Sequence, residues 1–218
     1  MLIALVLVSC GKSTPARELD LDLIKIPGAA NLRTDTVGDA QFASVSTFVL
    51  VDAQNTATQG AYVTLGGQLT DGTSTVVGEL KPQSLWIPAG ELRTFALVDS
   101  ERVPRPRASA ARILVHGAMV PESPPRVRVS GVRTFGEQNR TIVEGKLVNE
   151  AQRLAQAMVI ASFYDVHGQL MTRPFQLIVV DPQGRMQAVD AKDPTEVVRF
   201  VGPPGSSRAT MFVGDIIY

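Results

Sequence analysis

The chain has 218 residues, and its 21 Lys and Arg residues balance its 21 Asp and Glu residues to a formal net charge of zero. A neutral chain lacks the basic face that a nucleic-acid-binding protein needs to neutralise phosphates, so we expect no nucleic-acid partner. An apolar fraction of 44% can build real cores, which excludes general disorder, and 18 Gly with 14 Pro residues favour a turn-rich β protein over a helical bundle.

Residues 2–8 form an apolar run that is followed by a small residue, Ser9, and by the only cysteine, Cys10. From Met1 to Cys10 the stretch is about ten residues long, too short for a bilayer span of roughly 20 residues, and it has the size of a signal-peptide core. The segment Leu7-Val8-Ser9-Cys10 resembles the lipobox of bacterial lipoproteins. The resemblance implies a signal peptide over 1–9, cleavage before Cys10 and attachment of acyl chains such as palmitate to Cys10.

The same resemblance implies that the protein is located in the bacterial cell envelope. Acyl chains on Cys10 would hold a tether over residues 10–18 at the membrane, since each buried methylene contributes about 0.8 kcal/mol of membrane affinity. Gly11 is not followed by an acidic residue, which is compatible with export to the outer membrane. No Lys or Arg precedes the apolar run, although a signal peptide normally begins with positive charge, so a start site further upstream or a weak signal stays open. A buried strand with an ordinary cysteine is the alternative to a signal peptide.

Short strand-like segments with close turn signals follow the tether. Leu19–Leu23 alternates strictly between apolar and acidic residues and predicts a strand, whereas Gly28–Asp39 predicts a long loop. The further strands expected in this half are Val45–Val51, Ala61–Leu69, Ser74–Val77, Ser84–Ile87, Leu92–Val98 and Arg112–Val115. Pro121-Glu122-Ser123-Pro124-Pro125 then predicts a stiff linker, because three prolines in five residues do not fit a central strand.

The second half repeats this order of strands and turns. The strands expected there are Arg126–Val129, Thr141–Val148, Ala157–Tyr164, Phe175–Val180, Glu196–Val201 and Thr210–Val213. Glu150–Met158 consists of residues that prefer helix, but we expect a turn that leads into a strand there. No long 3.6-residue period is present, so the pattern favours an all-β sandwich over an α/β fold.

The two halves also align with each other at a constant offset. Val49, Asn55, Ala57, Ala61 and Asp71 fall on Val143, Asn149, Ala151, Ala155 and Asp165. We therefore expect two tandem β-sandwich domains, at 19–118 and 126–218, joined by a Pro-rich linker at 119–125.

One segment of the second half resembles the FxLYD domain family. The resemblance rests on Val143–Asn149, on the alternating strand Val159–Asp165 and on Gly168. Ala161 and Phe163 stand at the Phe and Leu positions of the family pattern, and the first half has Thr70 where Tyr is expected. The resemblance implies an immunoglobulin-like sandwich in exported bacterial proteins, often lipoproteins, and brings no catalytic residues. Phe163 is expected to point into the core and Tyr164 to the other side.

The sequence contains few patterns that are typical of a catalytic, metal or cofactor site. The two histidines, His116 and His167, lie in different halves, and no short-spaced ligand set predicts a metal or cofactor. Members of a Ser-His-Asp triad can be distant in sequence, so a hydrolase stays open, although no Gly-x-Ser-x-Gly segment supports one. We expect no enzyme and no catalytic, cofactor-binding or metal site.

Three further features carry two interpretations each. The cluster Arg102, Arg105 and Arg107 predicts a solvated loop, with contacts to anionic headgroups as the alternative. Trp86 predicts a core tryptophan, with an exposed carbohydrate platform as the alternative. Asn139-Arg140-Thr141 fits a glycosylation sequon that a bacterial lipoprotein would rarely use.

Together these features predict a membrane-anchored envelope lipoprotein that acts as a non-enzymatic protein-interaction or scaffold module. Its expected partners are the membrane, through Cys10, and another envelope protein that could add a strand to an exposed sheet edge. The alternative is a lipoprotein that binds a glycan or another small ligand.

Overall fold

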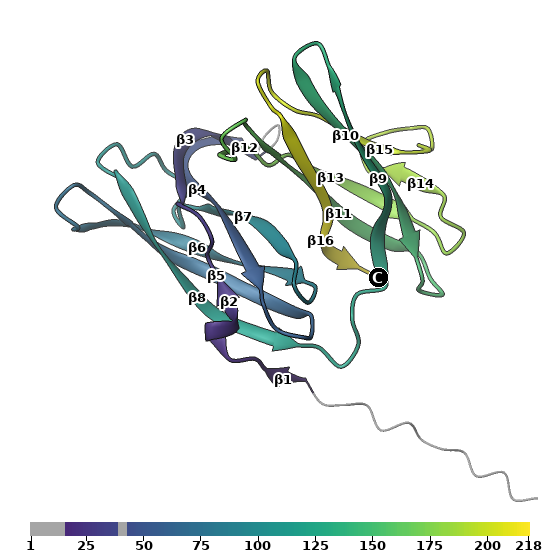
Figure 1. Cartoon of the computed structure of the whole chain (residues 1–218), viewed down its shortest axis with the longest axis horizontal. Coiled ribbons are helices and arrows are strands. Elements are labelled where there is room, and N and C mark those ends of the chain that lie inside the picture. Colours follow the sequence, from purple (N-terminus) through teal and green to yellow (C-terminus); the bar gives the residue numbers. More distant parts are fainter. Residues whose placement is uncertain (1–15, 39–42) are drawn as a thin grey trace, which may run out of the picture.

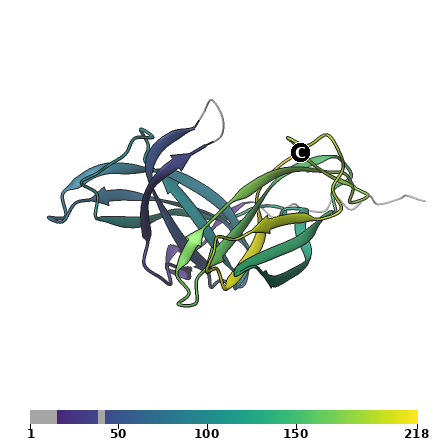
Figure 2. The ribbon, with the colours of Figure 1, turned by 90° about the horizontal axis from the view of Figure 1, so that it is seen from above.

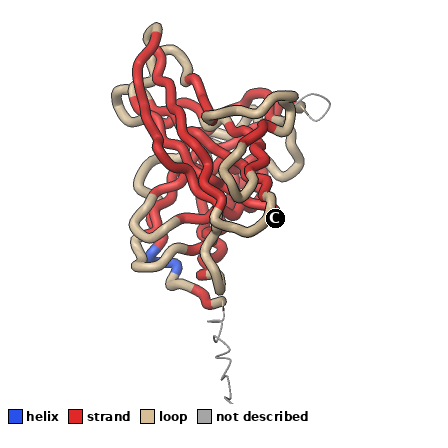
Figure 3. Tube along the Cα trace, turned by 90° about the vertical axis from the view of Figure 1, so that its right-hand side faces the viewer, coloured by secondary structure: helices blue, strands red, loops and turns tan. Residues whose placement is uncertain are grey.

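The computed structural model describes residues 16–38 and 43–218, and these residues confirm the all-β prediction. Cys10, the predicted signal peptide and most of the predicted tether lie outside the described residues. Figure 1 shows two bodies of strands side by side, and Figure 3 shows that strands and loops make up nearly the whole trace. Within the described ranges, no helix is long and apolar enough to cross a membrane.

Residues 16–120, here called the first half, form two antiparallel sheets. Sheet A has the order β1-β8-β5-β6, and sheet B joins β2, β3 and β7 to the central strand β4. The strands of the first half are β1 Arg17–Glu18, β2 Ile24–Lys25, β3 Asn31–Val37, β4 Ser44–Asn55, β5 Ala61–Thr70, β6 Val76–Ile87, β7 Leu92–Val98 and β8 Ala110–Val120.

Residues 127–218, the second half, form two more antiparallel sheets. Sheet C has the order β15-β10-β9, and sheet D joins β12, β13 and β16 to β11, with β14 beside β13. The strands are β9 Val127–Glu137, β10 Arg140–Asn149, β11 Ala155–Tyr164, β12 Leu170–Thr172, β13 Phe175–Val180, β14 Met186–Ala188, β15 Val198–Val201 and β16 Arg208–Ile217. No ladder between described strands joins the two halves.

Each half has its own apolar core, made by strands of both of its sheets. Period-two alternation along β5 sends Ala61, Val63 and Leu65 into the first core while Tyr62 and Thr64 point outward. In β11 the alternation separates Phe163, in the second core, from Tyr164, in a cluster with Leu50 and Leu170. The predicted opposite orientations of Phe163 and Tyr164 are therefore confirmed.

The halves repeat one strand-end arrangement in detail. Asn55 Nδ2 donates to the carbonyls of Gln59 and Ile87 at 2.8 and 3.0 Å, and its Oδ1 accepts the N–H of Ala57 at 3.0 Å. Asn149 makes the same three bonds, to Arg153 at 2.9 Å, Val180 at 3.0 Å and Ala151 at 2.9 Å. Asp71 and Asp165 likewise each accept backbone N–H groups two and four residues ahead through Oδ1.

Two predictions of local structure are wrong. Leu21–Leu23 is a turn of 3₁₀ helix, because the Asp20 carboxylate accepts the N–H of Asp22 and caps the turn instead of pointing from a strand face. The expected loop at Gly28–Asp39 contains β3, which pairs along β4 from Asn31↔Leu50 to Val37↔Ser44. The polar sequence of β3 lacks the apolar alternation that predicts a strand. β3 lies at the edge of sheet B, and none of its side chains is fully buried.

Other predicted elements are present in the structure, some of them with different first and last residues. Ser74–Val77 and Ser84–Ile87 belong to one continuous region, where β6 runs from Val76 to Ile87 and carries Pro82. A proline is compatible with β6 because that strand is the edge of sheet A. Glu150–Met158 is a turn that leads into β11, as expected.

Candidate binding cleft between the halves

The second half completes the core of the first half. Ile160 on β11 and Phe212 on β16 are 0% and 4% exposed, and both belong to the apolar cluster that β4–β8 build. Gly214 allows this close approach, since a Cβ there would lie 2.3 Å from Ile160 Cδ1 and 3.3 Å from Leu85 Cδ2. Figure 2 shows the strands of the two halves meeting in the middle of the molecule. Because one apolar cluster includes both halves, the halves hold each other in a fixed orientation.

A buried polar network lies beside this shared core. The Tyr164 hydroxyl donates to the Asp52 carboxylate at 3.2 Å, and the Thr94 hydroxyl donates to Asp52 Oδ1 at 2.6 Å. The Arg208 guanidinium lies 4.1 Å from the centre of the Tyr164 ring. Arg173 Nε donates to the Thr94 carbonyl at 2.7 Å, whereas its Nη2 has no hydrogen-bond partner among the described residues.

Burial sets the protonation behaviour of this network. Desolvation raises the pKa of Asp52, against the opposing hydrogen bonds from Thr94 and Tyr164. Burial and then the nearby Asp52 raise the pKa of Tyr164, and burial lowers the pKa of Arg173 to about 10. A raised carboxyl pKa means that the stabilising contribution of Asp52 is largest below its ordinary pKa and declines as pH rises through the raised value.

The halves enclose an open cleft of about 320 Å³ on the other side of the shared core. Its walls come from the ends of β5, β6 and β7 and from β9 and β16. Tyr62 and Trp86 stand opposite each other on β5 and β6, with ring centres 5.4 Å apart and planes tilted by 58°. Both rings are half-buried, and Trp86 rests over Gly60, where a Cβ would lie 2.3 Å from its ring. The absence of a side chain at Gly60 therefore leaves room for the indole to lie against the backbone there.

The expected core position of Trp86 is therefore wrong. Its neighbours Leu85 and Ile87 are 0% exposed and fill the first core, so the alternation of β6 must direct Trp86 to the opposite face. On that face Trp86 is half-buried beside Tyr62 and Gly60 and is one of the residues that line the cleft.

Charged groups line the same cleft. Arg93 has a side chain that is only 14% exposed; its Nη1 contacts Glu91 at 2.6 Å, and its guanidinium lies 4.8 Å from the Phe212 ring centre. Burial lowers the pKa of Arg93, and its Nε has no hydrogen-bond partner among the described residues. Burial, then Asp215 and Tyr218, raise the pKa of Tyr62. The cleft thus combines aromatic faces with one buried cation and exposed carboxylates.

A second hollow of about 430 Å³ continues the cleft along the linker, and Tyr62 and Pro125 line both hollows. The Tyr218 hydroxyl accepts the backbone N–H of Arg126 at 2.9 Å, and Arg153 lies 4.9 Å from the Tyr218 ring centre. The predicted linker is thus a wall of the cleft as well as a connection between the halves.

The residues singled out from the sequence do not converge on this cleft. His116 and His167 are exposed in different halves, and the described residues contain no group of three His, Cys, Asp or Glu that could hold a metal. Asn149 and Asp165 bond backbone groups, Tyr164 lies in the buried network, and Cys10 lies outside the described residues. Of the earlier candidates, only Trp86 reaches the cleft.

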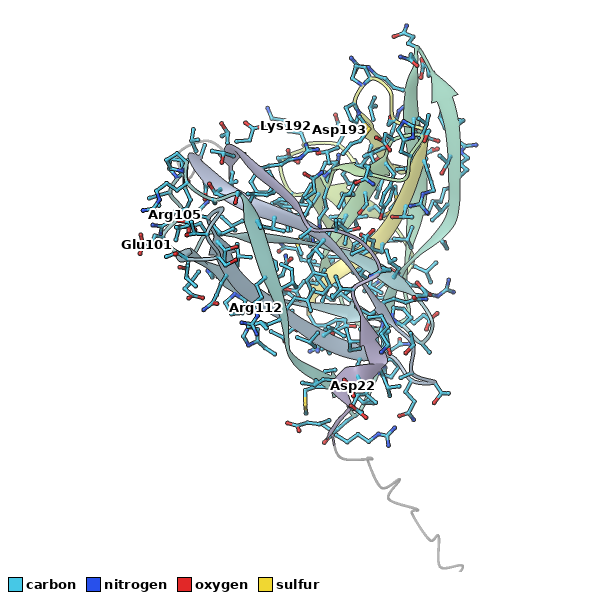
Figure 4. All side chains as sticks on the ribbon, turned by 60° about the vertical axis from the view of Figure 1, so that its left-hand side comes forward. Asp22, Glu101, Arg105, Arg112, Lys192 and Asp193 are labelled. Carbon is cyan, nitrogen blue, oxygen red and sulfur yellow. The ribbon has the colours of Figure 1, made fainter. Side chains whose placement is uncertain are left out.

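The arginine cluster lies in a largely exposed loop, as expected, and Arg105 and Arg107 are paired with carboxylates. Arg105 contacts Asp99, whose side chain is 0% exposed, at 2.8 Å and Glu101 at 2.7 Å, and Figure 4 shows Glu101 and Arg105 close together at the margin of the first half. Arg107 pairs with Asp71 at 2.6 Å and, after the bonds from Thr73, helps to lower the pKa of that carboxyl. These carboxylates offset the charge that an anionic headgroup would need.

Period-two alternation could have found part of the cleft. It places Tyr62 and Trp86 on the outer face of sheet A, but only the pairing Tyr62↔Trp86 brings them together. Arg93, Phe212 and Tyr218 carry no such local signal, since the packing of the two halves decides their positions.

Three comparisons, with protein-family models, with curated proteins and with solved structures, gave no match to this chain. The resemblances to lipoproteins and to FxLYD domains therefore stay predictions that rest on the residues quoted for them.

Proposed function

We propose that this chain is a lipid-anchored protein of the bacterial envelope, held by acyl chains on Cys10, that acts without catalysis as an interaction or scaffold module. In this proposal the two halves are tandem immunoglobulin-like domains of common origin, the second of them FxLYD-like. The recurring bonds of Asn55 and Asn149 and the matching strand arrangement support a duplication.

The observation that carries the proposed binding role is the cleft that contains Tyr62 and Trp86. Half-exposed aromatic rings are apolar on their faces and can accept a hydrophobic or proline-containing segment of a partner. The walls belong to two halves that share one apolar cluster, so they are already in place before binding and little order must be created. The proposed occupant is therefore a segment of another envelope protein.

Photo-crosslinking from position 86 tests this role. A photoreactive phenylalanine analogue in place of Trp86 is expected to form one reproducible adduct in intact envelopes, because its ring would face the bound segment. The same analogue in place of Phe175, which is 46% exposed outside the cleft, is the matched control. Equal adducts at both positions, or none at position 86, would contradict the proposed partner site.

The position of Trp86 in the cleft lining also favours a second candidate, a glycan or another small ligand. Sugar rings stack on exposed aromatic faces, and Glu91, Arg93 and Asp215 could supply hydrogen bonds beside them. Trp86 is the only tryptophan, so fluorescence excited selectively at tryptophan reports on the cleft. A saturable fluorescence change with envelope glycans, together with no protein adduct at position 86, would favour this candidate.

The anchor has its own test. The variant Cys10→Ala is expected to leave the membrane fraction almost completely, because a chain without acyl groups loses about 0.8 kcal/mol of affinity for each methylene no longer buried. Cell fractionation with mass spectrometry of the N-terminus provides the measurement, and Ser9→Ala, which keeps a small residue before the cysteine, is the control. Retention of Cys10→Ala in the membrane fraction would argue against the lipid anchor.

A further inference from the structure

The outer edge of β9 is the least protected long strand edge in the described part of the chain. β9 bonds only to β10, and every residue from Gly131 to Arg140 is exposed. Figure 1 shows the tip of the β9–β10 hairpin projecting at the top of the second half. Proteins usually protect such edges with proline, charge or short length. β6, the edge of sheet A, carries Lys81 and Pro82, whereas β9 is long, has no proline, and carries Arg133 and Glu137 of opposite charge.

The hairpin turn fixes which backbone groups of β9 point outward. Gln138 and Asn139 have φ values of 49° and 58°, the two left-handed residues of a type I′ turn, so Glu137 and Arg140 close the turn with a hydrogen bond. Along an antiparallel ladder, alternate residues direct their N–H and C=O groups to the same neighbour. The groups that face away from β10 therefore belong to Val132, Thr134 and Gly136.

We propose that a second copy of this chain adds its β9 to this edge, antiparallel, with the two-fold axis at Phe135. In that register Thr134 of one copy exchanges hydrogen bonds with Gly136 of the other, and Phe135 stands opposite its own equivalent. Arg133 of each copy then faces Glu137 of the other, so the dimer contains two such contacts. Sheet C becomes one continuous sheet with the order β15-β10-β9-β9-β10-β15.

Charge complementarity argues for a second copy over an unrelated strand. The side chains of Arg133 and Glu137 are 71% and 53% exposed and lie on the same face of β9. Across sheet C, Arg133 pairs with Glu144 at 2.8 Å, and Arg199 pairs with Glu144 at 3.1 Å and Glu137 at 3.2 Å, so opposite charges already alternate there. The two-fold register continues that alternation, whereas an unrelated strand with a basic residue opposite Arg133 would place like charges side by side.

Two further features are compatible with self-association. The ring of Phe135 is 38% exposed on this face, and its equivalent in the second copy would cover it. The formal net charge of zero means that two copies do not repel each other as whole molecules.

Disulfide trapping in the full chain tests the register. Residues opposite each other in a non-hydrogen-bonded antiparallel pair have Cα atoms about 4.5 Å apart, within the range that a disulfide spans. The variant Phe135→Cys is therefore expected to form a disulfide-linked dimer under mild oxidation. Val166→Cys, 75% exposed in a turn of the same half, is the control. It should form no disulfide-linked dimer although the β9 edges still pair, and the same is expected of the parent chain with Cys10 alone.

A second substitution separates strand pairing from random collision. Thr134→Pro removes an outward N–H without removing a bond to β10, so β9 should stay folded while the yield of the F135C dimer falls at least about tenfold. Thr134→Ala should leave the yield unchanged. The proposal is wrong if F135C dimerises no more than V166C, if T134P does not reduce its dimer, or if F135C becomes linked to a different envelope protein instead of to itself.

Discussion

Replacing Asn149 with alanine is expected to lower the free energy of unfolding by about 3 kcal/mol. The side chain is 5% exposed and satisfies the carbonyls of Arg153 and Val180 and the N–H of Ala151. Removal leaves three backbone groups without their partner, and each buried unsatisfied group costs about 1–3 kcal/mol, less where water can enter. Asn55→Ala should cost about as much, because Asn55 is 0% exposed and makes the equivalent bonds.

Urea denaturation of the variants measures this effect. Asn31→Ala is the matched control, since Asn31 is only half-buried and donates one bond, to the Leu170 carbonyl at 2.7 Å, so about 1 kcal/mol is expected. Asn149→Asp keeps the acceptor and loses both donors, and it should destabilise at least as much as alanine. If Asn149→Ala lowered the free energy of unfolding no more than Asn31→Ala, the hydrogen bonds that Asn55 and Asn149 share would not be what holds these strand ends.

Replacing Phe212 with alanine is expected to cost about 3–5 kcal/mol, the range for a large aromatic residue lost from a core. Phe212 lies in the second half but fills the core of the first, and its ring also contacts the Arg93 guanidinium. The cavity would open on the side of the cleft, and Arg93 would lose its aromatic neighbour. Phe175→Ala, at a phenylalanine that is 46% exposed, should cost less than about 1 kcal/mol.

The same variant tests how closely the two halves depend on each other. In the parent chain, unfolding followed by Trp86 fluorescence, which reports on the cleft, should coincide with unfolding followed by far-ultraviolet circular dichroism. Phe212→Ala should separate the two transitions, because the first half loses a part of its core that the second half supplies. Coincident transitions and a loss below about 1 kcal/mol would mean that the contact contributes little to holding the halves together.

Local patterns predicted the secondary structure well where one strand face is buried. The alternation in Ala61–Leu69 and the turn at Asp71 placed β5 almost to the residue, and helix propensity in Glu150–Met158 was correctly set aside. Local patterns failed at Leu19–Leu23, where a carboxylate cap competes with the strand, and at β3, whose pairing to β4 compensates for its polar sequence. Both errors lie at sheet edges, where burial gives the weakest pattern.

Only part of the candidate cleft can be predicted from the sequence. Trp86 was recognised as a residue with two possible roles, and alternation between Leu85 and Ile87 would have decided against the core. The partners of Trp86 were not predictable, since Tyr62 reaches it through strand pairing and Phe212 through the docking of the second half.

The sequence by itself determined the all-β class and most strand positions, because these depend on neighbours within a few residues and on the two-residue period of a strand. The tertiary structure alone decided the shared core, the buried network around Asp52 and Tyr164, and the cleft. Those features join residues that are distant in the chain, and only the register of the sheets and the packing of one half on the other bring them into contact.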